Sequence, residues 1–349
     1  MRKRHETKPV SVGGITIGGQ NRVVLQSMTT TKTENIDATI EEINRLATLG
    51  AELVRVAIVD ERDAAAIKTL KANTTVPLVA DIHFDYRLAL KAVEAGIDKL
   101  RINPGNIGTP DKVKAVVEAC KAKSVPIRIG VNAGSLERDL LETHGRTATA
   151  MVESAKRHVA LLEAEGFTDI IISLKASDVA LTIDSYRLAA ETFPYPLHLG
   201  LTEAGPVGPG AIKSAMAMGP LLLDGIGDTL RVSISGDRAD ELRIAKTILA
   251  NAGLYEQTNL VACPTCGRLD YDMMSLLNQV ESYLETHPTN LTIAVMGCAV
   301  NGPGEARDAD IGIAGGKQEG LLFAKGKIVK KVPQENLFEA FVELVESIK

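Results

Sequence analysis

The feature that most constrains the fold is a regular alternation of short apolar segments with longer amphipathic ones through the first two-thirds of the chain. The amphipathic stretches 36–49 and 152–165 carry apolar residues at helical spacing. The eight strand-like segments are Val23–Thr29, Leu53–Val59, Pro77–Phe84, Lys99–Pro104, Pro126–Asn132, Asp169–Lys175, Pro196–Glu203 and Thr229–Ser235. Strands that alternate with helices form parallel βα units, and eight units predict a closed (β/α)8 TIM barrel. An open, doubly wound sheet is the alternative.

The pattern changes after Leu254. A helix is expected over 269–285, a strand over 291–296, a hairpin around Lys325 and Gly326, and a closing helix over 334–348. The full length of 349 residues exceeds the roughly 250 residues of a typical barrel and leaves room for one smaller module. The sequence therefore predicts an α/β protein with a barrel over residues 1–254 and a smaller α/β domain over residues 255–349.

Composition and charge exclude several classes of function. The net charge of −5, the 3% of aromatic residues and the absence of tryptophan disfavour a nucleic-acid partner. The apolar runs are too short to span a bilayer, and the basic start of the chain leads into no apolar signal segment. Four cysteines, two of them in a CxxC motif, favour a reducing cytoplasm and a metal site over disulfides. We expect a cytoplasmic protein without nucleic-acid or membrane partners.

Polar and cationic residues gather at the carboxyl ends of the expected strands, where barrel enzymes carry their chemistry. They are Arg55, Asp81, His83, Arg101, Asn103, Arg128, Asn132, Lys175, Glu203, Arg231 and Ser233. Because strand side chains alternate between faces, Asp81 shares a face with His83, and Arg101 shares one with Asn103. This shared face is expected to be the barrel lumen.

Five of these residues are cations: Arg55, Arg101, Arg128, Lys175 and Arg231. Unpaired charges are costly to bury, and guanidinium groups offer paired donors to phosphate oxygens. The cations therefore predict a small substrate with two phosphates. The alternative is that each cation pairs with a carboxylate, but only Asp81 and Glu203 are evident. Glu203 is the candidate for proton chemistry because a carboxyl at a strand end can be tuned by its surroundings.

Three cysteines form the second candidate site. Cys263 and Cys266 belong to a CPTCGR segment, and Cys298 opens a segment that ends at Glu305. Thiolates at this spacing fit zinc or an iron–sulfur cluster, and Glu305 is a candidate for a displaceable fourth ligand. A structural zinc lacks an evident fourth ligand. Cys120 lies in a helical segment and is expected to be a small buried residue.

These motifs together resemble the GcpE family of 4-hydroxy-3-methylbut-2-enyl diphosphate synthases. The resemblance runs from end to end of the chain and is specific because so many motifs occur in order. The matching segments are QSMT at 26–29, RINPGN at 101–106, GVNAGSL at 130–136, SLKAS at 173–177, TEAG at 202–205, GDTLRVS at 227–233, CPTCGR at 263–268 and MGCAVNGPGE at 296–305.

The resemblance implies a [4Fe-4S] cluster on Cys263, Cys266 and Cys298, with Glu305 on the fourth iron when substrate is absent. It also implies reductive ring opening and dehydration of 2-C-methyl-D-erythritol 2,4-cyclodiphosphate, with electrons from flavodoxin or ferredoxin. The cationic strand ends and Ser233 would hold the diphosphate, Asn132 would lie near the reacting carbons, and Glu203 would protonate the departing oxygen. The family implies a homodimer in which the cluster module of one subunit closes the barrel of the other.

Two other functions fit the sequence less well. A barrel like that of the pterin-binding methyltransferases, with a structural zinc appendage, leaves the cations and the missing fourth ligand unexplained. A redox-sensing or metal-storage protein would not need so many polar strand ends. Metal and sulfide content distinguishes these alternatives from the cluster enzyme.

Overall fold

A computed structural model describes residues 4–298, 304, 306–316 and 318–348. The chain divides into two compact units, Met1–Leu254 and Tyr255–Lys349. Each unit has its own apolar core.

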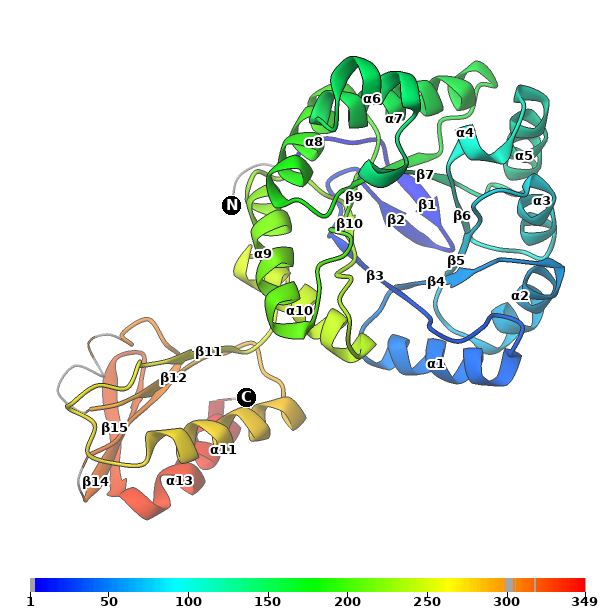
Figure 1. Cartoon of the computed structure of the whole chain (residues 1–349). Coiled ribbons are helices and arrows are strands. Elements are labelled where there is room, and N and C mark those ends of the chain that lie inside the picture. The colour runs from blue at the N-terminus through cyan, green and yellow to red at the C-terminus, as the bar shows by residue number, and fades with distance from the viewer. Residues whose placement is uncertain (1–3, 299–303, 305, 317, 349) are drawn as a thin grey trace. The chain divides into compact units, whose positions relative to one another are not determined.

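The first unit is a nearly closed barrel of eight parallel strands (Figure 1). The strands are β3 (Val24–Met28), β4 (Leu53–Ala57), β5 (Leu78–Asp81), β6 (Lys99–Ile102), β7 (Ile127–Asn132), β8 (Ile170–Lys175), β9 (His198–Leu199) and β10 (Thr229–Leu230). Neighbouring strands pair in the order β8-β7-β6-β5-β4-β3-β10-β9. At the seam, a parallel bridge joins Ile172 to Leu197, and Ile172 N donates a hydrogen bond of 2.9 Å to the carbonyl of Pro196. The predicted barrel is confirmed.

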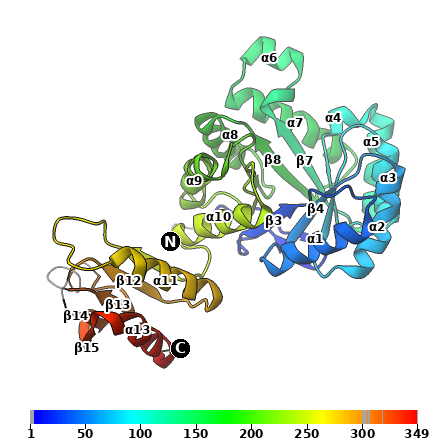
Figure 2. The same ribbon diagram turned by 60° about the horizontal axis from the view of Figure 1, so that its bottom comes forward.

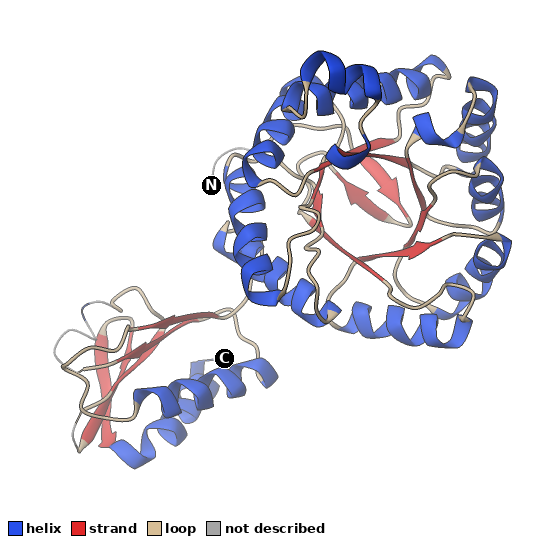
Figure 3. Cartoon of the chain, viewed as in Figure 1, coloured by secondary structure: helices blue, strands red, loops and turns tan. Residues whose placement is uncertain are grey.

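Helices surround the strands as an outer ring (Figure 3). They are α1 (Ile36–Thr48), α2 (Glu61–Asn73), α3 (Tyr86–Glu94), α4 (Pro104–Ile107), α5 (Pro110–Lys123), α6 (Arg138–His144), α7 (Ala148–Ala164), α8 (Val179–Thr192), α9 (Val207–Leu223) and α10 (Arg238–Asn251), with a 3-10 turn at Ala133–Ser135. Side chains that point outward from the strands, such as Leu100 and Ile129, are fully buried against these helices. Cys120 of α5 lies in this layer, as expected, and burial raises the pKa of its thiol to about 12.

A short hairpin closes the amino-terminal end of the barrel. Strands β1 (Val10–Val12) and β2 (Ile15–Ile17) pair around Gly13 and Gly14, whose φ angles of 54° and 89° suit a tight hairpin turn. Val10, Val12 and Ile17 are buried with the first inward residue of four strands. Those residues are Val24, Leu53, Val79 and Ile171. The lumen is therefore apolar at this end and polar at the other.

Among the described residues, the second unit contains a five-stranded mixed sheet and the helices α11 (Met273–Thr286) and α13 (Leu337–Ile348) (Figure 2). Its strands lie in sequence order: β11 (Asn259–Ala262), β12 (Thr292–Met296), β13 (Ile311–Ala314), β14 (Glu319–Ala324) and β15 (Lys327–Pro333). The first three are parallel, whereas β14 and β15 form an antiparallel hairpin. Both helices pack on one core that includes Ile293, Ile313 and Phe341.

Candidate functional site

The parallel register brings the charged strand ends together in the lumen. Asp81 lies opposite Arg101 on the neighbouring strand, and Arg101 lies opposite Arg128 on the next. Asn132 lies opposite Lys175. Side chains that the sequence places on separate strands therefore share adjacent positions at the carboxyl end of the barrel.

These side chains line a pocket of about 290 Å³. Its lining consists of Arg55, Asp81, His83, Arg101, Arg128, Asn132, Ser173, Lys175, Leu201, Thr202, Arg231 and Ser233. Nine of them are among the sequence-predicted site residues; Ser173, Leu201 and Thr202 are additions. Asp81 is the single carboxylate among these lining residues and shares the pocket with five Lys and Arg side chains.

Asp81 pairs with two of the cations. Its carboxylate lies 3.7 Å from Arg55 Nε and 3.2 Å from Arg101 Nη1. Burial alone would raise the pKa of Asp81, but Arg55 and Arg101 outweigh it, so this pKa lies below its usual value. Burial lowers the pKa of Arg55 to about 10 despite the attraction of Asp81. One carboxylate therefore leaves most of the positive charge uncompensated.

Glu241 is a functional partner that the sequence reasoning missed. This residue of α10 is 2% exposed and lies 3.3 Å from Arg231 Nη2. It also accepts a hydrogen bond of 3.2 Å from Ile234 N and pairs with Arg238. The expectation that only Asp81 and Glu203 could balance the cations was wrong. An acidic residue in the first turn of a helix is common, so its sequence position carried no specific signal.

Polar side chains continue from the pocket into the interior of the barrel. Lys99, Arg128 and His198 are each 0% exposed. Arg128 Nη1 donates a long hydrogen bond of 3.5 Å to Gln26, while Lys99 Nζ, Arg128 Nη2 and His198 Nε2 find no hydrogen-bond partner among the described residues. Burial, together with neighbouring cations, lowers the pKa of Lys99 and of His198 well below the usual values. The sequence reasoning missed Lys99 and His198, although each lies two or more residues before a recognised polar strand end.

Two predicted residues do not line this pocket. Asn103 is buried, and its Oδ1 accepts a hydrogen bond of 3.1 Å from Gly105 N, which makes Asn103 the N-cap of α4. Glu203 follows β9 at the barrel mouth, where it is exposed. Its φ of 55° lies in the left-handed region, which costs a non-glycine residue of order 1 kcal/mol and is concentrated at functional sites.

The cysteines of the second unit lie at the carboxyl edge of its sheet. Cys263 follows β11, and its N–H donates a hydrogen bond of 2.9 Å to Val295, three residues before Cys298. Both thiols approach Tyr271, whose hydroxyl donates to the Met296 carbonyl at 2.8 Å. Burial, reinforced by the two thiols, raises the pKa of Tyr271 to about 12. Cys263 and Cys298 are therefore neighbours through the sheet register.

Cys263 and Cys298 can serve as ligands of one metal group because they lie at the same edge of the sheet. Cys263 and Cys298 are half-buried, and Cys266 is exposed in the loop after β11. Glu305 lies outside the described residues. Within the described part of the chain, no three His, Cys, Asp or Glu side chains form a ready metal-binding group. The donor set suits an iron–sulfur cluster or zinc.

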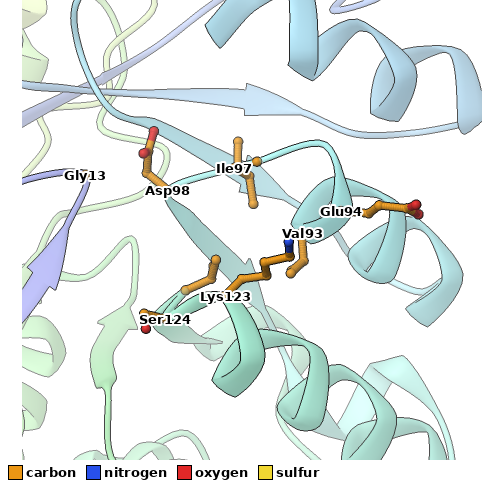
Figure 4. Close-up of a pocket in the computed structure, with 9 residues that line it drawn as sticks. Gly13, Val93, Glu94, Ile97, Asp98, Lys123 and Ser124 are labelled. Carbon is orange, nitrogen blue, oxygen red and sulfur yellow. The ribbon is translucent and has the colours of Figure 1, made fainter.

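A second pocket, of about 310 Å³, lies at the amino-terminal end of the barrel (Figure 4). It lies between the residues that precede β6 and β7, including Asp98 and Lys123, and the hairpin turn at Gly13. Asp98 already pairs with Lys71 and accepts a hydrogen bond of 2.7 Å from Leu78 N. Because barrel chemistry lies at the opposite end of the strands, we assign this pocket a structural role.

A barrel with a cationic pocket at the carboxyl ends of its strands defines an anion-binding barrel enzyme, here with a second unit that carries thiols at a sheet edge. The chain belongs to the GcpE family. Residues 7–246 match the family model described as the GcpE TIM-barrel domain, and residues 259–347 match the GcpE protein C-terminal domain.

Curated relatives agree over the full chain. One from Bacillus mycoides (strain KBAB4) is 55% identical over 350 residues and covers 100% of this chain and 96% of its own. One from Bacillus cytotoxicus is 56% identical over 347 residues, and the match covers 99% of this chain and 94% of the relative. Both are named 4-hydroxy-3-methylbut-2-en-1-yl diphosphate synthase (flavodoxin).

Two solved structures are similar in fold to part of this chain. Dihydropteroate synthase from Yersinia pestis is 14% identical, with a TM-score of 0.50, and covers 70% of this chain and 98% of its own. The spore coat polysaccharide biosynthesis protein spsE of Bacillus subtilis is 12% identical, with a TM-score of 0.51. The match covers 74% of this chain and 76% of the spsE chain. At such identities the likeness concerns the fold alone. No helix in the described part of the chain is long and apolar enough to cross a membrane.

Proposed function

We propose that this chain is an oxidoreductase that converts 2-C-methyl-D-erythritol 2,4-cyclodiphosphate to (E)-4-hydroxy-3-methylbut-2-enyl diphosphate. The names of relatives that are 55–56% identical over essentially the whole chain support this activity. The observation that carries the substrate class is the pocket, in which five Lys and Arg side chains share a single lining carboxylate. A cyclic diphosphate supplies the missing negative charge.

The overall reaction sets what the residues must do. The bond from C2 to its phosphate oxygen breaks, the C3 hydroxyl leaves as water, and a double bond forms between C2 and C3. Written with neutral acids, the reaction consumes two electrons and two protons and releases one water. The chain must therefore hold two phosphates, orient the carbon skeleton and deliver protons.

The phosphates are assigned to the cationic wall. Arg55, Arg101, Arg128, Lys175 and Arg231 bind them, with Ser233 as a hydroxyl donor. Lys175 is buried, and its burial among cations lowers its pKa well below the usual value. An arriving dianion reverses that electrostatic balance and favours the protonated lysine. Asp81 and Glu241 keep Arg101 and Arg231 oriented before the substrate binds.

The remaining pocket residues orient the reacting carbons. Asn132 and His83 face the space beside the phosphates and can bind the hydroxyl groups of the substrate. Glu203 lies at the mouth and is proposed to protonate the departing C3 oxygen. Its left-handed backbone favours a functional role for this position, since a glycine would adopt the same φ without strain.

A [4Fe-4S] cluster is proposed on Cys263, Cys266 and Cys298, with Glu305 as the fourth ligand. When bound, the cluster supplies the two electrons one at a time. Flavodoxin, which the names of the relatives contain, is the proposed electron donor, with ferredoxin as the alternative. We further propose a cytoplasmic homodimer in which the second unit of one subunit serves the barrel of the other.

The deciding experiment purifies the protein without oxygen and measures iron, acid-labile sulfide, zinc and turnover of the cyclodiphosphate with reduced methyl viologen. About four irons and four sulfides per chain, with formation of the allylic diphosphate, support the proposal. Stoichiometric zinc after expression with ample iron, and no turnover, would reject it. Mixing inactive Glu203→Gln and Cys298→Ser chains tests the shared site, because activity returns only if each dimer can assemble one intact site from two chains.

A further inference from the structure

The outer edge of the second unit carries a concentration of positive charge that its overall composition does not lead one to expect. From Tyr255 to Lys349 the chain has 13 acidic and 8 basic residues. Four of those basic residues occur in the seven-residue stretch 325–331, and Arg307 packs against Gly326 in the same hairpin turn. An acidic unit therefore has one cationic edge, which we define as Arg307, Lys325, Lys327, Lys330 and Lys331.

This edge is accessible along its length. Strand β15 is the last strand of the sheet, and each residue from Lys327 to Lys331 is exposed (Figure 1). Ile328 and Val329 in its middle are each 52% exposed. Lys325 has a φ of 48° and lies at the tip of the hairpin beside Gly326. Ile328 and Val329, flanked by lysines, form a small exposed surface. Surfaces of this kind are used in transient encounters that are steered by charge.

The sheet register connects this edge to the thiols. Met296 lies opposite Ala314, Ala314 opposite Leu321, and Leu321 opposite Lys331. Neighbouring strands are about 4.8 Å apart, so three steps separate Lys331 from β12 by about 14 Å. Cys298 follows Met296 by two residues. Lys331 therefore lies level with the carboxyl end of β12 across a hydrogen-bonded sheet, whereas Lys327, opposite Ala324, lies toward the other end of the strands.

The proposed function requires two different molecules to reach the thiols. The carboxyl ends of β11 and β12, where the thiols lie, must face the substrate during turnover. An electron donor has to approach from another side. The sheet has two exposed edge strands, β11 and β15, and of these only β15 carries lysines. Charge complementarity decides the kind of partner, because the cationic edge attracts an acidic surface while the acidic remainder of the unit repels one.

We propose that this cationic edge is the docking surface for an acidic electron-transfer protein that reduces the second unit. The inference rests on the proposed function and adds to it the location of electron entry. Since exposed charges are screened by salt, reduction by such a donor should slow as ionic strength rises from about 50 to 300 mM.

The test compares two electron donors. Wild type, Lys327→Glu/Lys331→Glu and a matched control, Lys68→Glu/Lys114→Glu, are assayed with flavodoxin and with methyl viologen, both reduced. The control residues are exposed on α2 and α5 of the barrel and give the same change in net charge. Lys330 is left unchanged because it pairs with Glu343 at 3.0 Å.

We expect the β15 variant to raise the KM for flavodoxin at least tenfold, to lose its salt dependence, and to keep wild-type turnover with methyl viologen. An unchanged KM for flavodoxin, or an equal rise in the control, overturns the docking surface. Absence of turnover by the wild type with methyl viologen rejects the proposed function instead, so the two failures are distinguishable. A neutral Lys327→Gln/Lys331→Gln variant should show a smaller rise in KM of the same sign.

Discussion

The guanidinium of Arg101 lies over Gly130 on the neighbouring strand β7, so closely that a Cβ added at Gly130 would come within 2.5 Å of Arg101 Nε. This approach lets Arg101 reach Asp81 at 3.2 Å and His83 Nε2 at 3.2 Å. A side chain as small as a methyl group would push Arg101 out of that arrangement. The missing side chain at Gly130 is therefore part of the binding site.

We expect Gly130→Ala to raise the KM for the cyclodiphosphate at least tenfold and to cost about 1–3 kcal/mol of folding stability through overpacking. Gly219→Ala is the matched control, because its Cβ would meet no atom within 4 Å and it lies within α9. The control should change the free energy of unfolding by less than about 1 kcal/mol, because the helix preference of alanine is opposed by the restriction that Pro220 places on the residue before it. Steady-state kinetics and urea unfolding measure both effects, and wild-type KM in Gly130→Ala would refute this role of the glycine.

Lys99 predicts a pH dependence of stability. Burial, together with Arg128 and Arg55, lowers the pKa of Lys99 in the folded protein. In the unfolded chain this pKa is about 10.4, so between the two pKa values the unfolded state binds more protons than the folded state. The free energy of unfolding should therefore rise as pH increases between the lowered folded pKa and about 10.4. Lys99→Met should be more stable than wild type at neutral pH by about 2 kcal/mol. The free energy of unfolding of this variant should rise less steeply with pH.

Urea unfolding at several pH values measures that difference, with the exposed Lys68→Met as the control. Because the charge of Lys99 helps to lower the pKa of His198, the variant is also expected to raise the pKa of that histidine. A Lys99→Met variant less stable than wild type at neutral pH would show that Lys99 is held by favourable contacts rather than tolerated in a costly position.

The barrel and most of its mouth were predictable because their signals are periodic and local. Arg101 and Arg128 occupy paired positions on the neighbouring strands β6 and β7, and parallel strands bring such positions together. Lys99 was missed because a lysine early in a strand resembles a solvated strand start, and its burial depends on how the barrel closes. Glu241 was missed because its contact with Arg231 depends on how α10 packs against the barrel.

Smaller elements were missed for a related reason. The three-residue strands β1 and β2 are too short for a pattern, although the Gly13-Gly14 pair is a hairpin signal. Strand β13 consists of small and branched residues that carry little alternation. Strands β9 and β10 are two residues long where seven-residue segments or longer were expected. The predicted hairpin around Lys325 and Gly326 is confirmed as β14 and β15.

The Arg231–Glu241 pair predicts a stability cost for removing one partner. Burial lowers the pKa of Arg231, and Glu241 opposes that shift by holding the guanidinium at 3.3 Å. Glu241→Gln leaves a buried cation with weaker compensation, so we expect a loss of about 3 kcal/mol in the free energy of unfolding. Asp240→Asn is the control in the same helical turn, since its pair with Arg243 is exposed to solvent and should contribute less than about 1 kcal/mol. Equal losses in urea unfolding would contradict the importance of burial.

The cysteines allow the sharpest contrast, because the chain contains its own control. Cys298 is half-buried at a sheet edge beside Cys263, whereas burial in the barrel raises the pKa of Cys120 to about 12 and keeps it a thiol. A cysteine binds iron or zinc as the thiolate rather than as the thiol. We expect Cys298→Ser to lose most of its iron and at least a hundredfold in turnover while the barrel stays folded. Cys120→Ala should retain full iron content and turnover with a modest loss of stability.

Iron analysis, the visible absorption of the anaerobic protein and circular dichroism measure these outcomes. Loss of iron in both variants would point to general unfolding, and retention in both would remove Cys298 from the cluster site.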